Sequence, residues 1–242
     1  MSIWGKIVGG ATGFALGGPI GALIGTVAGH AVDKMRRAKG PVSEEQRQAA
    51  FSVAVIVLAA KMAKADGVVT RDEVDTFKRL FRVPPQATRD VGRLYDQAKR
   101  AVAGYEPYAR QVATLFRDSP HVLEELLDGL FQIAHADNVI HPDELGFLRR
   151  VAEIFGFDQE TFDRISAGHG APDASNPYDI LGLAPGADAA EAKAAYHKLV
   201  REYHPDKLMA QGMPQEFIDV ANAKLATINE AYAQIRRGRG AG

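Results

Sequence analysis

A stretch of 23 residues without a charged side chain, residues 7–29, constrains this chain more than any other feature. It reads IVGGATGFALGGPIGALIGTVAG. As an α-helix it would be about 34 Å long, which matches the hydrocarbon core of a bilayer. A cleaved secretory signal is the competing interpretation, but the apolar run is too long for one and only Lys6 precedes it as a basic residue. The sequence therefore predicts a retained transmembrane helix.

Glycine occupies every fourth position of this stretch. The six residues fall on one slowly drifting face of a helix: Gly9, Gly13, Gly17, Gly21, Gly25 and Gly29. A row of small residues lets two transmembrane helices approach closely, so it predicts a homodimer formed through the membrane helix. A flexible glycine-rich leader is the alternative, and Pro19 disfavours a straight helix.

Basic residues predominate directly after the uncharged stretch. Asp33 is accompanied by four cations, Lys34, Arg36, Arg37 and Lys39. Basic residues next to a transmembrane helix mark its cytoplasmic side. The remainder of the chain is therefore predicted to be cytoplasmic.

An internal repeat dominates the middle of the chain. From residue 41 to 166 the apolar spacing is helical, and no alternating strand pattern competes with it. MAKADGVVTRDEVDTFKRL, from Met62, aligns without gaps with IAHADNVIHPDELGFLRRV, from Ile133, at an offset of 71 residues. We expect a duplicated helix–loop–helix unit, with its two halves packed as a pseudo-twofold all-α domain.

The tripeptide His-Pro-Asp occurs first inside this repeat, at residues 141–143, where it is interpreted as a helix start. In the other copy Thr70 and Glu73 form a capping box, and Pro142 occupies the corresponding first helical position, where proline is well tolerated. Acidic residues in a first turn also suit the helix dipole. These acids are Asp72, Glu73, Asp143 and Glu144, and none needs a ligand to explain it.

A divalent-cation site is the alternative interpretation of the acidic loops. Asp66 and Asp137 each precede the first-turn acids by six residues, but the spacing lacks the alternating oxygen ligands of an EF-hand. The segments KADGVVTRDE and HADNVIHPDE resemble the TerB-like family, an all-α fold with paired acidic loops, over residues 44–166. Metal binding is what that resemblance implies. From the residues themselves we expect no metal and no cofactor.

The second copy of the tripeptide follows a helix of different character. Between Asp188 and Tyr203 the apolar residues Ala192, Ala195, Tyr196, Leu199 and Tyr203 recur at helical spacing, and Lys193, His197 and Arg201 lie four apart on another face. Pro205 ends this helix and begins a turn that projects His204 and Asp206. A second helix is predicted from Gln215, with core positions Phe217, Ala221, Leu225, Ile228 and Tyr232. The expected shape is two antiparallel helices joined by a loop.

Three segments resemble the J domain of the DnaJ or Hsp40 family in order and spacing: NPYDILGL, EAKAAYHKLVREYHPDK and INEAYAQI. The resemblance covers residues 176–235, with a longer loop at LMAQGMPQE. It implies that His204, Pro205 and Asp206 trigger ATP hydrolysis by an Hsp70 partner, Asp206 above all. It also implies that the acidic surface of the partner is bound by Lys193, His197, Lys198 and Arg201. Glu202 replaces a residue that is commonly basic in the family, and we interpret Tyr178, Leu181, Leu183, Phe217 and Leu225 as core.

The predicted fold class is all-α: an N-terminal transmembrane helix, a TerB-like helical domain with an internal repeat, and a C-terminal J-domain helical hairpin. The expected boundaries are a membrane anchor at 1–40, the TerB-like domain at 41–166, a linker at 167–175 and the J domain with a basic tail at 176–242. This layout is similar to a membrane-anchored DnaJ-like co-chaperone family. The resemblance implies a single-pass protein of the bacterial inner membrane with both domains in the cytoplasm.

Several function classes are disfavoured. No nucleophile–base pair, phosphate-binding glycine loop or zinc motif was identified, so we expect no catalytic residue and no enzyme activity. With 29 basic and 30 acidic residues, a nucleic-acid partner is not indicated. The expected partners are a DnaK-type Hsp70 and the membrane, with the TerB-like domain selecting a client or partner. Two alternatives remain, a membrane metal or stress sensor that acts through the TerB-like domain and a structural glycine-zipper oligomer.

Overall fold

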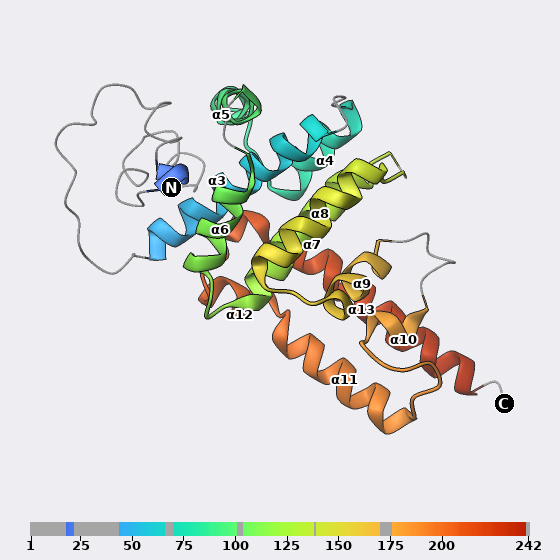
Figure 1. Ribbon diagram of the computed structural model, residues 1–242. Helices are drawn as coiled ribbons and strands as arrows, with labels where there is room; N and C mark the ends of the chain where they lie inside the picture. Colours follow the sequence, from blue (N-terminus) through green and yellow to red (C-terminus); the bar gives the residue numbers. More distant parts are fainter. Residues whose placement is uncertain are drawn as a thin grey trace.

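The computed structural model describes residues 18–21, 44–65, 70–100, 104–137, 139–169 and 176–240. Every regular element in these residues is helical (Figure 1). In chain order they are α3 (Glu44–Ala65), α4 (Arg71–Leu80), α5 (Thr88–Arg100), α6 (Glu106–Leu115), α7 (Pro120–Ala134), α8 (Pro142–Phe155), α9 (Gln159–Ala167), α10 (Pro177–Ile180), α11 (Ala189–Glu202), α12 (Pro205–Ala210), the 3₁₀ helix η3 (Gln215–Phe217) and α13 (Ile218–Gly240). The predicted all-α class is confirmed.

Helices α3 and α7 form the centre of residues 44–169, which we call the body. Residues 49–63 of α3 and residues 122–131 of α7 are buried without interruption. Helices α5, α6 and α8 pack against α3, and α4 and α8 pack against α7. A helix that is apolar on nearly every face is stable only when other elements cover it on all sides. This explains why the two most apolar helices of the body are central.

The repeat forms two helix–loop–helix units, α3–α4 and α7–α8, as predicted. Thr70 N–H donates to Glu73 at 2.6 Å, and Glu73 N–H donates to Thr70 Oγ1 at 3.2 Å, which confirms the capping box. In the second unit Pro142 is the first residue of α8, and His141 N–H donates to Glu144 at 3.0 Å. Helix α3 contacts α8 and α4 contacts α7, as expected if the two units are related by a pseudo-twofold axis.

Helices α10, α11 and α13 form a second, smaller core in residues 176–240, which we call the C-terminal hairpin. Helices α11 and α13 lie side by side, with α10 against α13 (Figure 1). The buried apolar residues of this core are Leu181, Ala192, Leu199, Tyr203, Ile228, Ala231 and Ile235. Tyr178, Leu183, Ala195, Tyr196, Leu225 and Tyr232 are partly buried against them. The apolar faces predicted for the two helices are thus confirmed.

The connection between α11 and α13 differs from the predicted turn. It contains helix α12 and the 3₁₀ helix η3, and α13 begins at Ile218. Leu208, Met213 and Phe217 of this connection are buried in the core of the body. The ring of Phe217 lies 4.9 Å from that of Phe51 and 4.8 Å from that of Phe81. Phe217 is therefore a core residue, but of the body, because the longer loop carries apolar side chains beyond what the hairpin can bury.

The transmembrane helix predicted at residues 7–29 lies outside the described residues except for residues 18–21. The described residues also exclude the four basic residues of 34–39 and five of the six glycines: Gly9, Gly13, Gly17, Gly25 and Gly29. Residues 18–21, which include Gly21, form a short helical segment in which Ile20 is fully buried against the body and donates its N–H to Gln111 at 2.9 Å. Within the described part of the chain, no helix has both the length and the apolar character to cross a bilayer.

Candidate functional site

The second His-Pro-Asp tripeptide lies at a sharp junction between two helices. Tyr203 ends α11, His204 is the N-cap of α12, and Pro205 is the first residue of α12. Asp206 N–H donates to His204 Nδ1 at 3.3 Å, so the imidazole accepts one of the free amide groups at the helix start. The side chain of His204 is 53% exposed and that of Asp206 is 81% exposed. The junction thus presents an imidazole and a carboxylate to solvent.

The first tripeptide has nearly the same local backbone. His141 is an N-cap with φ −68° and ψ 148°, and His204 is an N-cap with φ −63° and ψ 128°. In both copies proline is the first helical residue and aspartate lies in the first turn. The prediction that Pro205 begins a turn was therefore wrong, because Pro205 begins helix α12. What differs is the environment, since Pro142 is exposed whereas Pro205 is buried.

Three of the four residues predicted to bind the Hsp70 share one face of α11. Lys193, His197 and Arg201 are exposed and follow one another at intervals of four residues. Lys198 is also exposed, but it lines a cleft between α11 and the body together with Glu202. Within the described part of the chain, no ion pair involves Lys193, Lys198 or Arg201. These cations are therefore available for a partner, and Glu202 lies beside the basic face.

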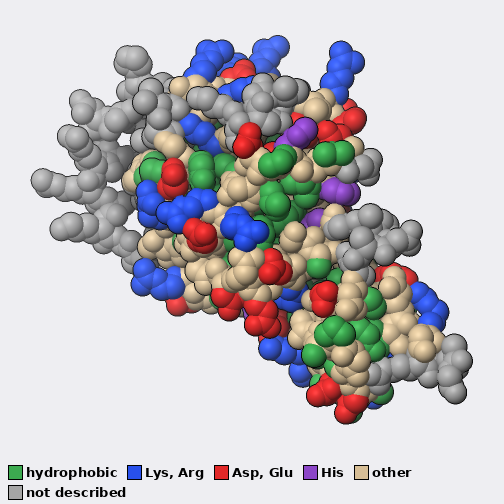
Figure 2. Space-filling model, turned by 45° about the vertical axis from the view of Figure 1, so that its right-hand side comes forward, with side chains coloured by type: hydrophobic (Ala, Val, Ile, Leu, Met, Phe, Trp, Pro, Cys, Tyr) green, Lys and Arg blue, Asp and Glu red, His purple; other side chains and the backbone are tan. Residues whose placement is uncertain are grey.

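The rest of the visible surface carries no extended region of one charge sign. Acidic and basic side chains are interspersed over the face shown in Figure 2.

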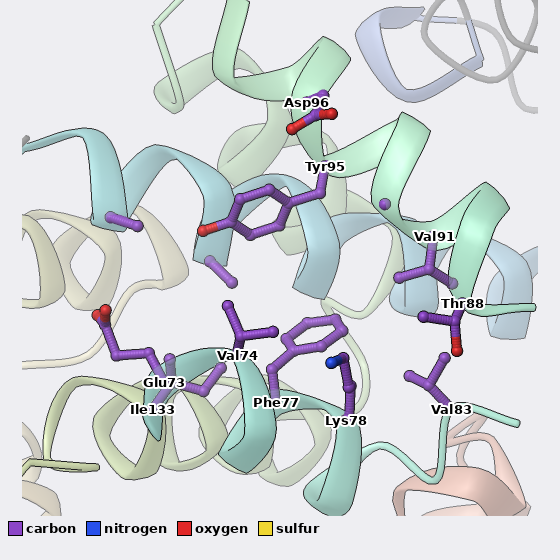
Figure 3. A pocket seen from close by; sticks show the side chains of 13 residues that line it. Glu73, Val74, Phe77, Lys78, Val83, Thr88, Val91, Tyr95, Asp96 and Ile133 are labelled. Atoms are coloured by element: carbon purple, nitrogen blue, oxygen red, sulfur yellow. The ribbon is translucent and has the colours of Figure 1, made fainter. Parts of the chain in front are cut away.

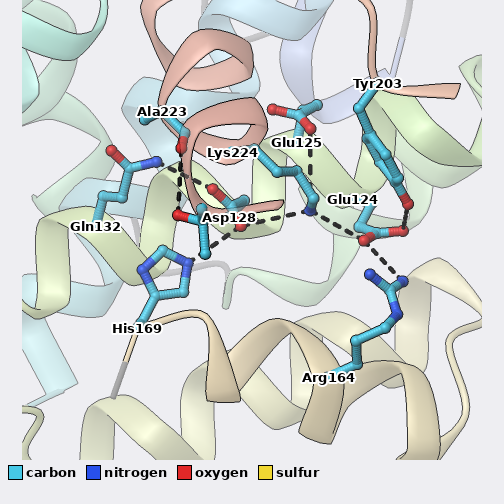
Figure 4. Close-up of polar contacts among 10 residues, drawn as sticks. Glu124, Glu125, Asp128, Gln132, Arg164, His169, Tyr203, Ala223 and Lys224 are labelled. Carbon is cyan, nitrogen blue, oxygen red and sulfur yellow. Dashed lines mark hydrogen bonds and ion pairs between the residues drawn. The ribbon is translucent and has the colours of Figure 1, made fainter. Parts of the chain in front are cut away.

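A buried cluster of polar residues includes Tyr203, which directly precedes the second tripeptide (Figure 4). Lys224 of α13 reaches into it, with Nζ 2.9 Å from Glu124 Oε1 and 3.4 Å from Asp128 Oδ1. We define the buried cluster as Glu124, Glu125 and Asp128 of α7, Arg164 of α9, and His169, Tyr203 and Lys224. It joins the body to the C-terminal hairpin.

Glu124 contacts three other members of the buried cluster. Its Oε1 accepts Lys224 and also pairs with Arg164 Nη2 at 2.8 Å. Its Oε2 accepts a short hydrogen bond from the Tyr203 hydroxyl. Burial would raise the pKa of Glu124, but the charges of Lys224 and Arg164 hold that pKa below its usual range. Burial raises the pKa of Tyr203 far above its usual range, so the hydroxyl stays protonated as a donor.

The pKa values of the other two carboxyl groups of the buried cluster, Asp128 and Glu125, are shifted in opposite directions. Against the effect of burial, Lys224 and His169 hold the pKa of Asp128 far below its usual range, with His169 Nε2 at 3.1 Å from Oδ1. Burial raises the pKa of Glu125 well above its usual range, and neither of its oxygens has a hydrogen-bond partner among the described residues. Burial therefore favours the uncharged form of the Glu125 carboxyl group. The anions Glu124 and Asp128 then balance the cations Lys224 and Arg164.

This cluster was not predicted from the sequence, although the sequence contains one usable signal for it. Lys224 lies three residues after Ala221 and four before Ile228, so it falls on the apolar face of its own helix. A lysine is almost never fully buried without an anionic partner. The three acids of α7 are flanked by leucines in the same way.

A mostly apolar pocket of about 170 Å³ lies between α3, α4 and α5 (Figure 3). Val74, Phe77 and Tyr95 line it, and Glu73 at its edge is already used by the helix cap. Among the described residues no group of three or more histidine or acidic side chains is arranged to hold a metal ion. Asp137 accepts Val139 N–H at 3.1 Å, and Asp66 lies outside the described residues. Metal binding therefore stays an implication of the family resemblance.

Comparisons with known families divide the chain into three matched parts. The model of the co-chaperone DjlA transmembrane domain matches residues 1–47, that of the tellurite resistance protein TerB matches residues 52–167, and that of the DnaJ domain matches residues 176–237. Both resemblances seen in the sequence are confirmed.

Full-length relatives show the same order of domains. The co-chaperone protein DjlA of Photobacterium profundum is 31% identical over 275 residues, covering 98% of this chain and 99% of the relative. The DjlA proteins of Vibrio parahaemolyticus and Escherichia coli K12 are 31% and 28% identical, each covering 99% of both chains. No solved structure matches this chain.

Proposed function

This chain belongs to the DjlA co-chaperone family, and on that premise we propose that its J domain stimulates the ATPase of a DnaK-type Hsp70 at the bacterial inner membrane. The chain is a membrane-anchored J-domain co-chaperone, so it regulates an enzyme and is not one itself. One observation carries the proposal: the exposed His204 and Asp206 flank the buried Pro205 at the end of α11, whose basic face makes no ion pair among the described residues.

We assign two tasks to the residues of this site. Lys193, His197 and Arg201 attract the acidic surface of the Hsp70, with Lys198 contacting it from the side of the cleft. Exposed charges of this kind mainly accelerate encounter and are screened by salt. His204 and Asp206 contact the partner after docking and favour its hydrolysing conformation, since a ligand shifts an equilibrium only by binding one state more tightly.

The salt dependence of stimulation tests this assignment. The measurement is the steady-state ATPase rate of a DnaK-type Hsp70 against the concentration of the full chain in lipid vesicles, at two salt concentrations. We expect stimulation at both, with a higher half-saturating concentration at high salt and a similar maximum, because salt screens the docking charges. Absence of stimulation at low salt contradicts the proposed function.

We propose that the TerB-like domain, expected at residues 41–166 and forming most of the body, selects the client or partner. It is the larger part of the described chain, and it carries the apolar pocket between α3, α4 and α5. Apolar clefts with a few polar groups are the usual form of a recognition site. Loss of one bound client after substitution at Phe77, with Hsp70 stimulation retained, is the measurement that tests this role.

The proposed orientation places the body and J domain in the cytoplasm. Its support is the basic segment at residues 34–39, which directly follows the uncharged stretch. A reporter enzyme that is active only in the cytoplasm, fused after Gly242, should be active. Activity of a periplasm-specific reporter at the same position contradicts this orientation.

We also propose that the chain forms a homodimer through the glycine face of residues 9–29. Six glycines at intervals of four permit close approach of two helices in a bilayer. Crosslinking in membranes, with Gly17 and Gly21 replaced by leucine, measures the contribution of that face. Undiminished dimer in the variant would contradict the assignment.

A further inference from the structure

Both neighbours of His204 in the chain are held by the body. Tyr203 is 1% exposed, and its ring meets that of His121 edge to face at 5.1 Å. Lys224 Nζ lies 4.6 Å from the centre of the Tyr203 ring on its face. On the other side of the tripeptide, Pro205 is buried and Leu208 is fully buried in the core of the body. Two buried anchors therefore hold the tripeptide: Tyr203 before it, and Pro205 with Leu208 on the other side of His204.

A single carboxylate of the body, that of Glu124, holds the first of these anchors, Tyr203. Glu124 accepts the Tyr203 hydroxyl on one oxygen and pairs with Lys224 and Arg164 on the other. Tyr203 ends α11, Lys224 belongs to α13, and Arg164 belongs to α9, so one side chain of α7 contacts three other segments (Figure 4). Inside a protein such charge-assisted hydrogen bonds are strong and directional. The position of Tyr203 is thus tied to α7.

From this geometry we infer that the body positions the His-Pro-Asp tripeptide for the Hsp70 through the contact of Glu124 with Tyr203. Glu124 and Tyr203 are positioning residues, since both are buried and neither can touch the partner. This inference rests on the proposed function and adds regulation to it: a change in the body that moves α7 alters stimulation without altering the docking face.

A positioning role predicts a different kinetic change from a docking role. If the basic face of α11 is intact, the half-saturating concentration of the chain stays the same. If the tripeptide is held less firmly, fewer docked complexes reach the hydrolysing state, so the maximum stimulation falls. A merely structural role of the buried cluster would lower thermal stability and leave both values unchanged at a temperature where the variant is folded.

The test is Tyr203→Phe in the full chain, which removes the hydroxyl and keeps the ring. We expect a several-fold lower maximum stimulation, an unchanged half-saturating concentration, and faster amide exchange at Asp206. Glu124→Asp is the second variant, because it keeps the charge but withdraws the carboxylate from Tyr203. Glu125→Gln is the matched control. Glu125 lies next to Glu124 and is buried, its oxygens make no hydrogen bond among the described residues, and glutamine has nearly the same shape, so wild-type stimulation is expected.

The outcomes separate the inference from the proposed function. A folded Tyr203→Phe variant that matches the wild type at every concentration overturns the inference, as does one that raises the half-saturating concentration instead. If Tyr203→Phe does not fold, Glu124→Asp decides by the same criteria. If the wild type itself fails to stimulate, the proposed function fails, and amide exchange at Asp206 alone decides whether Glu124 and Tyr203 hold the tripeptide.

Discussion

Replacing Asp206 by asparagine should reduce Hsp70 stimulation to nearly the basal rate while the chain stays folded. The Asp206 side chain is 81% exposed, and the nearest ionisable group, His204 Nδ1, is 3.8 Å from its carboxylate. The substitution keeps the backbone N–H of Asp206, which donates to the capping His204 side chain. Replacing a residue at the centre of an interface costs about 2 kcal/mol or more of binding free energy, which is roughly 30-fold in an equilibrium constant. The ATPase rate of the Hsp70 and the thermal melt of the variant are the two measurements.

Asp143→Asn is a control that the chain itself supplies. Asp143 lies in the first turn of α8 as Asp206 lies in the first turn of α12, each behind an N-cap histidine and an initial proline. Both substitutions therefore remove a favourable interaction with a helix dipole, worth about 0.3–1 kcal/mol. Only Asp206→Asn should abolish stimulation. A folded Asp206→Asn variant with wild-type stimulation, or loss of stimulation in Asp143→Asn alone, contradicts the assigned site.

The two tripeptides also show what local sequence can predict. Proline at a first helical position suits both copies, so the backbone around His141 and His204 is nearly the same. The two copies differ in their framework: a basic helix precedes His204, and the DnaJ domain model matches the segment that contains this second copy. The prediction from the sequence was wrong about the backbone that follows, because residues 205–210 form a helix whose Leu208 is buried by the body. Local signals specify the start of an element, whereas tertiary burial decides how far it continues.

Helical spacing predicted faces but not the partners of those faces. The apolar face of α11 was predicted, and Leu199 and Tyr203 are buried as expected. Phe217 was also correctly predicted as core, yet it packs on Phe51 and Phe81. The buried cluster joins side chains about one hundred residues apart in the chain, Lys224 and Glu124 among them. No local sequence pattern indicates a contact between residues so far apart in the chain. A lysine at a core position indicates only that an anion must lie nearby.

Replacing Lys224 by methionine should destabilise the chain more than any surface substitution. The Lys224 ammonium lies within 4.0 Å of Glu124, Glu125 and Asp128. Methionine fills a similar volume, so the main effect is on charge. The two buried anions, Glu124 and Asp128, are left with Arg164 as the one cation of fixed charge in the buried cluster. Removing one partner of a buried ion pair costs about 3–5 kcal/mol. For a chain of this size that lowers the melting temperature by roughly 6–20 °C.

The pH dependence of this loss has a definite sign. Lys224 lowers the folded-state pKa values of Glu124 and Asp128, so the stability that it supplies is complete above their unfolded values. That stability is lost as the carboxylates become protonated in the folded state. The difference in melting temperature between wild type and Lys224→Met should therefore begin to shrink below about pH 4. A difference that grows as the pH falls contradicts the electrostatic explanation.

The double variant Lys224→Met, Asp128→Asn tests whether charge balance is what the buried cluster requires. It removes one cation and one anion, and it leaves Glu124 paired with Arg164 and bound to Tyr203. It should be more stable than Lys224→Met alone, although a second polar group has been changed. Contacting residues commonly show coupling energies of about 0.5–3 kcal/mol, and thermal melts of both single variants and the double variant measure the value here. Additive losses would show that Lys224 acts through packing. Because the Glu124–Tyr203 contact is retained, the double variant should also stimulate the Hsp70 to the wild-type maximum wherever it is folded.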